Sequence, residues 1–184
     1  MRTILNKSFF NRQTLKVAED LLGKFIVKKN KKEEISAMIT EVEAYDGFED
    51  GASHAHKGKT DRNEIMFGDA GYWYVYLVYG MYNMLNIVTD KKDYPAAILI
   101  RGIECGGEII AGPGKLTKFL KINKNFNKKK ATQKIGLWIE DRGVKIKNSE
   151  IKRTSRIGVD YAGMCAEKPY RFVLIKKNNH LETN

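Results

Sequence analysis

The chain has 184 residues, with 33 Lys and Arg against 22 Asp and Glu, and its formal net charge is +11. Hydrophobic residues make up 42% of the sequence, which is enough to build a core at this length, so disorder over the whole chain is excluded and one domain, residues 1–184, is expected. Two cysteines are too few for a disulfide framework, and neither a signal peptide nor an apolar run of about 20 residues is recognisable, so we expect a soluble cytoplasmic protein without a membrane partner.

The first predicted element is an amphipathic helix that starts at Asn11 or Thr14 and ends at Gly23, because apolar residues recur at helical spacing between them. Runs of β-forming residues then predict strands at 24–27, 35–45, 73–78, 85–88, 96–100, 135–140 and 171–175. Residues 115–120 have the composition of a second helix, and residues 176–184 are expected to be a frayed polar tail. Strands that follow one another without long crossovers favour an α+β fold, with a largely antiparallel core sheet and flanking helices.

Two carboxylates lie in the predicted strand 35–45. Side chains alternate between the faces of a strand, so the odd-numbered residues are expected to share one side, where Glu41 and Glu43 extend an apolar stripe. A carboxylate there is either solvated at the rim of the sheet or partly buried, and a buried one needs hydrogen bonds or a function. Because Tyr45 and His54 follow within a dozen residues, we expect a general base beside an aromatic wall and a polar group.

Two other patterns suggest chemistry that the sequence does not support. His54 and His56 could ligate a metal, but no third ligand has a suitable spacing, so neither a metal nor a cofactor is expected. The stretch 112–117 resembles a phosphate-binding loop, but Ile109 occupies the position of its first glycine and Leu116 follows the lysine. A nucleoside triphosphatase is therefore excluded.

Aromatic residues and positive charge both indicate nucleic acid. The surplus of Lys and Arg over Asp and Glu indicates a polyanionic partner, although lysine runs such as 28–32 and 128–130 are typical of solvated loops. Five of the nine tyrosines fall between Tyr72 and Tyr82, and the predicted turn near Gly80 carries large apolar groups such as those that enter a base stack. A non-catalytic module that stacks single-stranded bases on tyrosines is an alternative at this point.

Taken together, these segments resemble the alkyladenine (3-methyladenine) DNA glycosylase family. The matching stretches run in order along nearly the whole chain, within residues 41–45, 62–67, 74–86, 99–101, 112–116, 156–158 and 168–172. The resemblance implies a single mixed α+β domain whose protruding β-hairpin enters the minor groove of double-stranded DNA.

The family resemblance also implies roles for individual residues. Glu43 matches the catalytic acid that activates a water. The pocket for a flipped base corresponds to Tyr45, His54, Tyr76 and Asn86, and Asn86 is the residue that excludes guanine. The DNA-binding residues correspond to Tyr79, Met81, Arg101, Thr60 and Arg62. Tyr79 would fill the gap left in the duplex. The loop that holds Thr60 and Arg62 departs from the mammalian pattern, because it is one residue shorter and carries Asp61 where a proline is expected.

The expected activity is base-excision repair of alkylated or deaminated purines, namely 3-methyladenine, 7-methylguanine and hypoxanthine. A glycosylase with lyase activity needs a lysine amine to form a Schiff base, and no lysine lies between Glu41 and Ser53. We therefore expect a monofunctional, monomeric glycosylase that leaves an abasic site.

Overall fold

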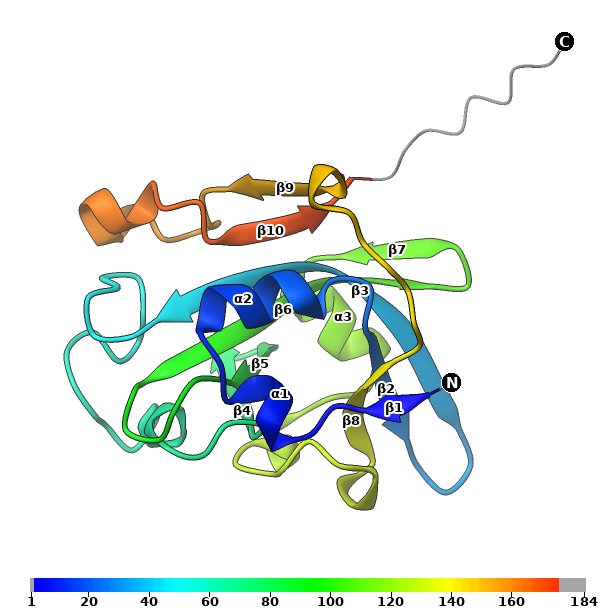
Figure 1. The fold of residues 1–184 in the computed structure, drawn as a ribbon. Helices are drawn as coiled ribbons and strands as arrows, with labels where there is room; N and C mark the ends of the chain where they lie inside the picture. Colours follow the sequence, from blue (N-terminus) through cyan, green and yellow to red (C-terminus); the bar gives the residue numbers. More distant parts are fainter. Residues whose placement is uncertain (1, 176–184) are drawn as a thin grey trace, which may run out of the picture.

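The computed structural model describes residues 2–175, which form an antiparallel sheet with short helices packed against it (Figure 1). The α-helices are α1 (Lys7–Phe10), α2 (Thr14–Leu21) and α3 (Pro113–Phe119). The strands are β1 (Thr3–Ile4), β2 (Phe25–Lys29), β3 (Glu34–Asp46), β4 (Trp73–Val78), β5 (Tyr82–Val88), β6 (Ala96–Cys105), β7 (Glu108–Ala111), β8 (Leu137–Asp141), β9 (Ile151–Thr154) and β10 (Arg171–Leu174). Among the 3-10 helices, η1 covers Glu64–Phe67 and η5 covers Asp160–Ala166.

The sheet has the order β1-β8-β2-β3-β6-β5-β4, and every pairing between its strands is antiparallel. One edge of the long strand β3 pairs with β2 along its first half and with β10 along its second half. Figure 1 shows α2 in front of the central strands β3 and β6, and the β9–β10 hairpin beside β3. The predicted α+β fold with a largely antiparallel core sheet, flanking helices and a protruding β-hairpin is confirmed; the hairpin is β4–β5.

The predicted elements are present, with shifted ends. The strand predicted at 135–140 begins at Leu137, because Gln133–Ile135 form a 3-10 turn that ends at Gly136 in the left-handed region. The strand predicted from residue 85 already begins at Tyr82. Strands β1, β7 and β9 were not predicted, since two to four residues are too few to leave an alternating pattern. The tail predicted at residues 176–184 lies outside the described residues.

The expectation that the odd-numbered residues of 35–45 share one face is wrong. Ala37 and Ile39 belong to the main core, but so do Val42 and Ala44. The pairing of β3 with β6 is irregular on both sides of Glu41, and this irregularity reverses the alternation. The second half of β3 therefore turns its odd-numbered side chains away from the core.

The same reversal occurs in β6, where Ile98, Ile100 and Ile103 all belong to the core. Gly102 lies at the point of reversal, and a Cβ there would come within 2.9 Å of the Cβ of Glu41. A glycine is thus required where the two backbones approach closely.

The central strands present different surfaces on their two faces. On one face, Trp73 and Val75 of β4 belong to the main core, which also contains residues of α2 and α3. The opposite face carries Tyr74 in a smaller cluster with Met66 of η1. Among helices within residues 2–175, none combines the length and apolar character that a membrane crossing needs.

Candidate active site

A cavity of about 260 Å³ opens on the face of the sheet that turns away from the main core. Its walls come from β3, β4, β5, β6, the loop after β3 and the segment that enters η5. The sequence-predicted residues among those that line it are Tyr45, His54, Tyr76, Tyr79, Asn86 and Arg101. The alternation of the four strands, reset by the irregularity in β3 and β6, brings Tyr45, Tyr76, Asn86 and Arg101 to one face, while His54 comes from the loop after β3 and Tyr79 from the β4–β5 turn.

Glu43 lies directly behind this wall. Its side chain has no exposed surface, and three of its neighbours, Tyr45, Arg101 and Ile157, line the cavity. The hydroxyl of Tyr45 donates to Oε2 of Glu43 at 3.0 Å, and the backbone N–H of Ile157 donates to Oε1 at 2.8 Å. Arg101 Nε lies 3.3 Å from Oε1. The carboxylate is therefore buried with a donor for each oxygen, as a buried charge requires.

A second carboxylate shares the cation beside Glu43. Arg101 Nε donates to Glu41 at 2.9 Å, and Arg171 Nε of β10 donates to the same oxygen of Glu41 at 2.7 Å. Because Arg101 faces two carboxylates, its charge is divided between Glu41 and Glu43. Burial raises the pKa of Glu43, and the opposing effects of Arg101, the Ile157 N–H and the Tyr45 hydroxyl do not cancel this rise.

His54 contributes a neutral ring to the wall. Its Nδ1 lies 3.0 Å from the hydroxyl of Tyr74, and its ring meets Tyr76 edge to face with 4.7 Å between centroids. Although part of His54 is open to solvent, desolvation of the ring and, to a smaller extent, the positive charge of Arg62 together lower its pKa to about 4. His54 is therefore uncharged at neutral pH.

The tyrosines of β4 form an aromatic surface at the cavity. The rings of Tyr74 and Tyr76 lie 5.0 Å apart, and the guanidinium of Arg62 lies 5.0 Å from the centroid of Tyr76. Asn86 on β5 donates from Nδ2 to the carbonyl oxygens of Tyr74 and Met84, each at 3.2 Å. These two bonds fix the orientation of the Asn86 amide in the cavity wall.

The tip of the β4–β5 hairpin exposes large apolar side chains to solvent. Tyr79 is 86% exposed and Met81 is 67% exposed. Tyr79 also has a positive φ of 51°, a conformation that non-glycine residues seldom adopt. Tyr79 lies at the cavity rim, whereas Met81 is not among the residues that line it.

The two sequence-predicted residues of the loop 55–63 have different surroundings. The backbone N–H of Thr60 donates to Asn63 at 2.7 Å, and the Thr60 side chain is exposed, away from the cavity lining. Arg62 packs on the cavity tyrosine Tyr76 as described above. His56 bonds to the carbonyl oxygen of Phe48, and across residues 2–175 no three His, Cys, Asp or Glu side chains gather as metal ligands would.

Sequence reasoning missed three contributors to the site. The backbone N–H of Ile157 holds Glu43, and Tyr161 lines the cavity, where its hydroxyl donates to the carbonyl oxygen of Ala52 at 3.3 Å. Arg156 forms a buried ion pair with Asp50. The family-like stretch 156–158 was the only sequence signal for Arg156 and Ile157, and it carried no assigned role, while Tyr161 lies outside the family-like stretches.

Comparison with known proteins places this chain in a family. A model of the methylpurine-DNA glycosylase family matches residues 8–178. A protein of Methanocella arvoryzae is 44% identical over 185 residues, and the match covers 92% of this chain and 91% of the relative. A protein of Sodalis glossinidius is 46% identical over 173 residues, and the match covers 92% of this chain and 96% of the relative. Both carry the provisional name 3-methyladenine DNA glycosylase. The chain belongs to the methylpurine-DNA glycosylase family, so the resemblance drawn from its motifs is confirmed.

Proposed function

We propose that this protein is a DNA glycosylase of base-excision repair, which takes a damaged purine out of duplex DNA into the cavity and hydrolyses its N-glycosidic bond. The observation that carries the proposal is a fully buried carboxylate, Glu43, directly behind a cavity walled by Tyr45, Tyr76 and His54. A nucleotide inside a duplex is inaccessible to such a cavity, so the base must be flipped out of the stack.

Glu43 is the proposed catalytic residue. Cleavage of a glycosidic bond passes through an oxocarbenium-like sugar, and an ionised carboxylate both orients the attacking water and stabilises the positive charge that develops. The contacts to Arg101 and to the Ile157 N–H favour the ionised form of Glu43. Since Glu43 has no exposed surface, the attacking water has to approach it from the cavity, past the three neighbours that line it, Tyr45, Arg101 and Ile157.

The aromatic wall would select electron-poor purines. A purine methylated at a ring nitrogen is cationic, and tyrosine faces attract cations through their electron density. A neutral His54 adds no repelling charge to such a base. Asn86, whose amide is fixed by two backbone carbonyls, is proposed to disfavour the exocyclic amine of guanine. 7-Methylguanine carries the same amine, but its cationic ring gains the attraction of the tyrosine faces that neutral guanine lacks. We assign 3-methyladenine, 7-methylguanine and hypoxanthine as the substrate purines.

The exposed tip of the β4–β5 hairpin and the positive net charge of the protein both support double-stranded DNA as the substrate. Tyr79 and Met81 extend from the β4–β5 tip, and an apolar side chain there can fill the gap that a flipped nucleotide leaves. Arg101, Arg62 and Thr60 are assigned to the DNA-facing side of the site. We propose that the enzyme acts as a monomer on double-stranded DNA in the bacterial cytoplasm.

None of the cavity-lining residues, all within the described part of the chain, is a lysine. A Schiff base with the sugar needs an amine, so we propose a glycosylase without lyase activity. The alternative of an open stacking platform explains the tyrosines but gives no role to a buried acid behind them.

The test uses purified protein and duplexes that contain one hypoxanthine or one 3-methyladenine, with the undamaged duplex as control. We expect release of the damaged base alone, and strand breaks only after alkali. Strand breaks without alkali, or an adduct trapped by borohydride, would contradict the absence of lyase activity. No base release from any damaged duplex, together with tight binding of single-stranded RNA, would establish the stacking module instead.

A further inference from the structure

The ion pair between Arg156 and Asp50 joins two segments that are distant in sequence. Nη1 and Nη2 of Arg156 lie 2.5 and 2.7 Å from the two carboxylate oxygens of Asp50, and neither side chain has exposed surface. Withdrawing two charges from water costs free energy that their attraction does not reliably recover, so the pair is weak evidence for a stabilising role. Its neighbours suggest a different role.

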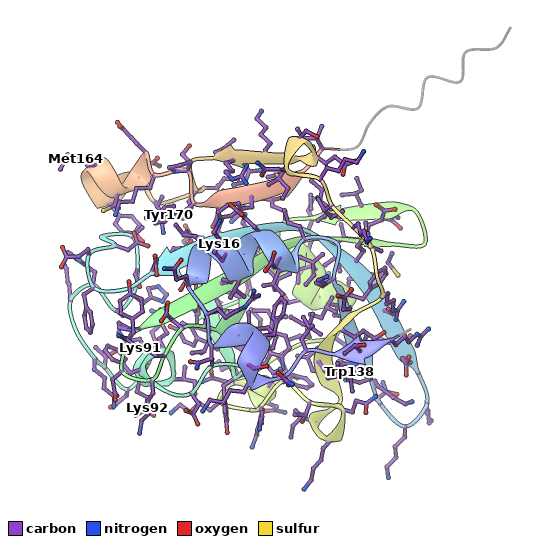
Figure 2. All side chains as sticks on the ribbon, viewed as in Figure 1. Lys16, Lys91, Lys92, Trp138, Met164 and Tyr170 are labelled. Carbon is purple, nitrogen blue, oxygen red and sulfur yellow. The ribbon has the colours of Figure 1, made fainter. Side chains whose placement is uncertain are left out.

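Arg156 packs against the aromatic residue that holds Glu43. Its guanidinium carbon lies 4.9 Å from the ring centroid of Tyr45 and 5.2 Å from that of Tyr170, so it contacts both rings. The same guanidinium donates to the carbonyl oxygen of Ala44 at 2.8 Å, directly before Tyr45 in β3. Figure 2 shows Tyr170 between the β9–β10 hairpin and the sheet, and Met164 at the outer end of the same C-terminal segment. The position of Tyr45 thus depends on Arg156 through its ring and its backbone.

The residue after Arg156 supplies the other neutral donor to Glu43. The backbone N–H of Ile157 is 2.8 Å from Oε1, while the Tyr45 hydroxyl is 3.0 Å from Oε2. We propose that Arg156, held by Asp50, is a positioning residue that sets both of these donors and thereby the orientation of the Glu43 carboxylate. The inference rests on the catalytic role proposed for Glu43.

The charged surroundings of Glu43 define how this role is measured. The groups that face it are Arg101 from β6, Glu41 and Tyr45 from β3, Tyr76 from β4, and Arg156 from the segment before η5. Arg171 of β10 pairs with Glu41. Both donors set by Arg156 favour ionised Glu43, so their displacement leaves its burial less compensated and raises its pKa further.

The principal variant is Arg156→Lys, which keeps the charge but loses the planar fork and the ring contacts. With enzyme in excess over a hypoxanthine duplex, we expect base release to slow by about tenfold or more, since small misplacements of catalytic groups are costly. The acid limb of the rate is expected to move to higher pH, and duplex affinity to stay within about twofold.

Arg142→Lys is the matched control. Arg142 also lies over a ring, that of Phe25 at 4.2 Å, and pairs with Glu140 at 2.7 Å, but it does not line the cavity. It is expected to leave both the rate and its pH dependence unchanged. If Arg156→Lys lowers only the melting temperature, with an unaltered acid limb and rate per folded molecule, the positioning role is overturned.

Two further measurements keep the inference testable. Should Arg156→Lys fail to fold, Asp50→Asn removes the charge that holds Arg156 and is expected to shift the acid limb in the same direction; an unshifted limb contradicts the role. In a Tyr45→Phe background, Arg156→Lys is expected to slow release by less than in the wild type, because the two act through one contact, and a fully additive effect would contradict this.

An activity-independent readout separates this inference from the proposed function. The titration of the Glu43 carboxyl, followed by carbon NMR, is expected to occur at higher pH in Arg156→Lys than in the wild type. An unchanged titration overturns the positioning role, even in an active enzyme. Absence of base release by the wild type would instead overturn the proposed function, while a raised titration would still support the control of Glu43 by Arg156.

Discussion

At the scale of single residues, the protonation state of Glu43 sets the pH range of the proposed reaction. Burial raises the pKa of this group, and the proposed role needs its ionised form. The rate is therefore expected to be full above that raised pKa and to fall as the pH drops through it, at a higher pH than for an exposed glutamate. A pH series of base release under enzyme excess measures this limb.

His54 provides the matched test of that assignment. Its pKa of about 4 keeps it neutral between about pH 5 and 8, so it should not generate the acid limb. We expect His54→Gln to slow base release, because the edge contact with Tyr76 is lost, while the acid limb stays at its wild-type pH. An acid limb that disappears in His54→Gln would assign the titrating group to His54 instead.

The side chains of the site could be proposed from the sequence, but the contacts between them could not. Glu43, Tyr45 and His54 have types and spacing that motifs reveal. The N–H of Ile157 belongs to the backbone and leaves no side-chain signature. The pairing of Arg156 with Asp50 joins residues 106 positions apart, and only the packing of the C-terminal segment brings them together.

At the scale of elements, the irregularity shared by β3 and β6 turns Glu43 toward the cavity. We expect Gly102→Ala to destabilise the fold by about 1–3 kcal/mol, because the added Cβ would overlap Glu41, and to slow base release by displacing Arg101. Urea denaturation measures the first effect. Gly51→Ala is the control, since a Cβ at Gly51 meets only ordinary contacts at 3.4 Å or more; equal losses in both variants would contradict the explanation.

This irregularity also shows where pattern reasoning fails. Runs of β-forming residues located β3 to within one residue at each end and the start of β6, because strand propensity is local, but β6 continues to Cys105, beyond the predicted 96–100. The reversal of alternation depends on two strands distorting together at Thr40, Glu41 and Gly102, and the sequence of either strand alone does not indicate it. The sequence predicted that the odd-numbered residues of β3 all share one face, whereas in the structure the even-numbered Val42 and Ala44 lie in the core.

The exposed hairpin tip gives a second prediction at this scale. Tyr79→Ala is expected to weaken binding of a lesion-containing duplex by about tenfold or more, as stacking contacts with bases are worth about 1–3 kcal/mol each. Its melting temperature should change little, because Tyr79 is 86% exposed. Ile109→Ala on β7 serves as the exposed apolar control. Unchanged duplex affinity in Tyr79→Ala would remove the hairpin tip from the interface.

At the scale of the whole molecule, the net charge of +11 predicts salt-dependent association with DNA. A protein that contacts about six phosphates loses about 10³ in affinity between 50 and 200 mM salt, through counterion release. We expect a linear fall of log affinity with log salt for undamaged duplex, while the rate of base release from fully bound enzyme stays constant. A flat salt dependence would contradict an interface built on phosphate contacts.

Glu43 is proposed to perform the chemistry, and Glu43→Gln is the most direct test, because glutamine has nearly the same shape and cannot act as a base. The measurement is base release from a hypoxanthine duplex with enzyme in excess, beside duplex affinity and melting temperature. We expect a rate at least about 10²-fold lower, with affinity within about twofold and a folded protein. Release at the wild-type rate would contradict this role of Glu43.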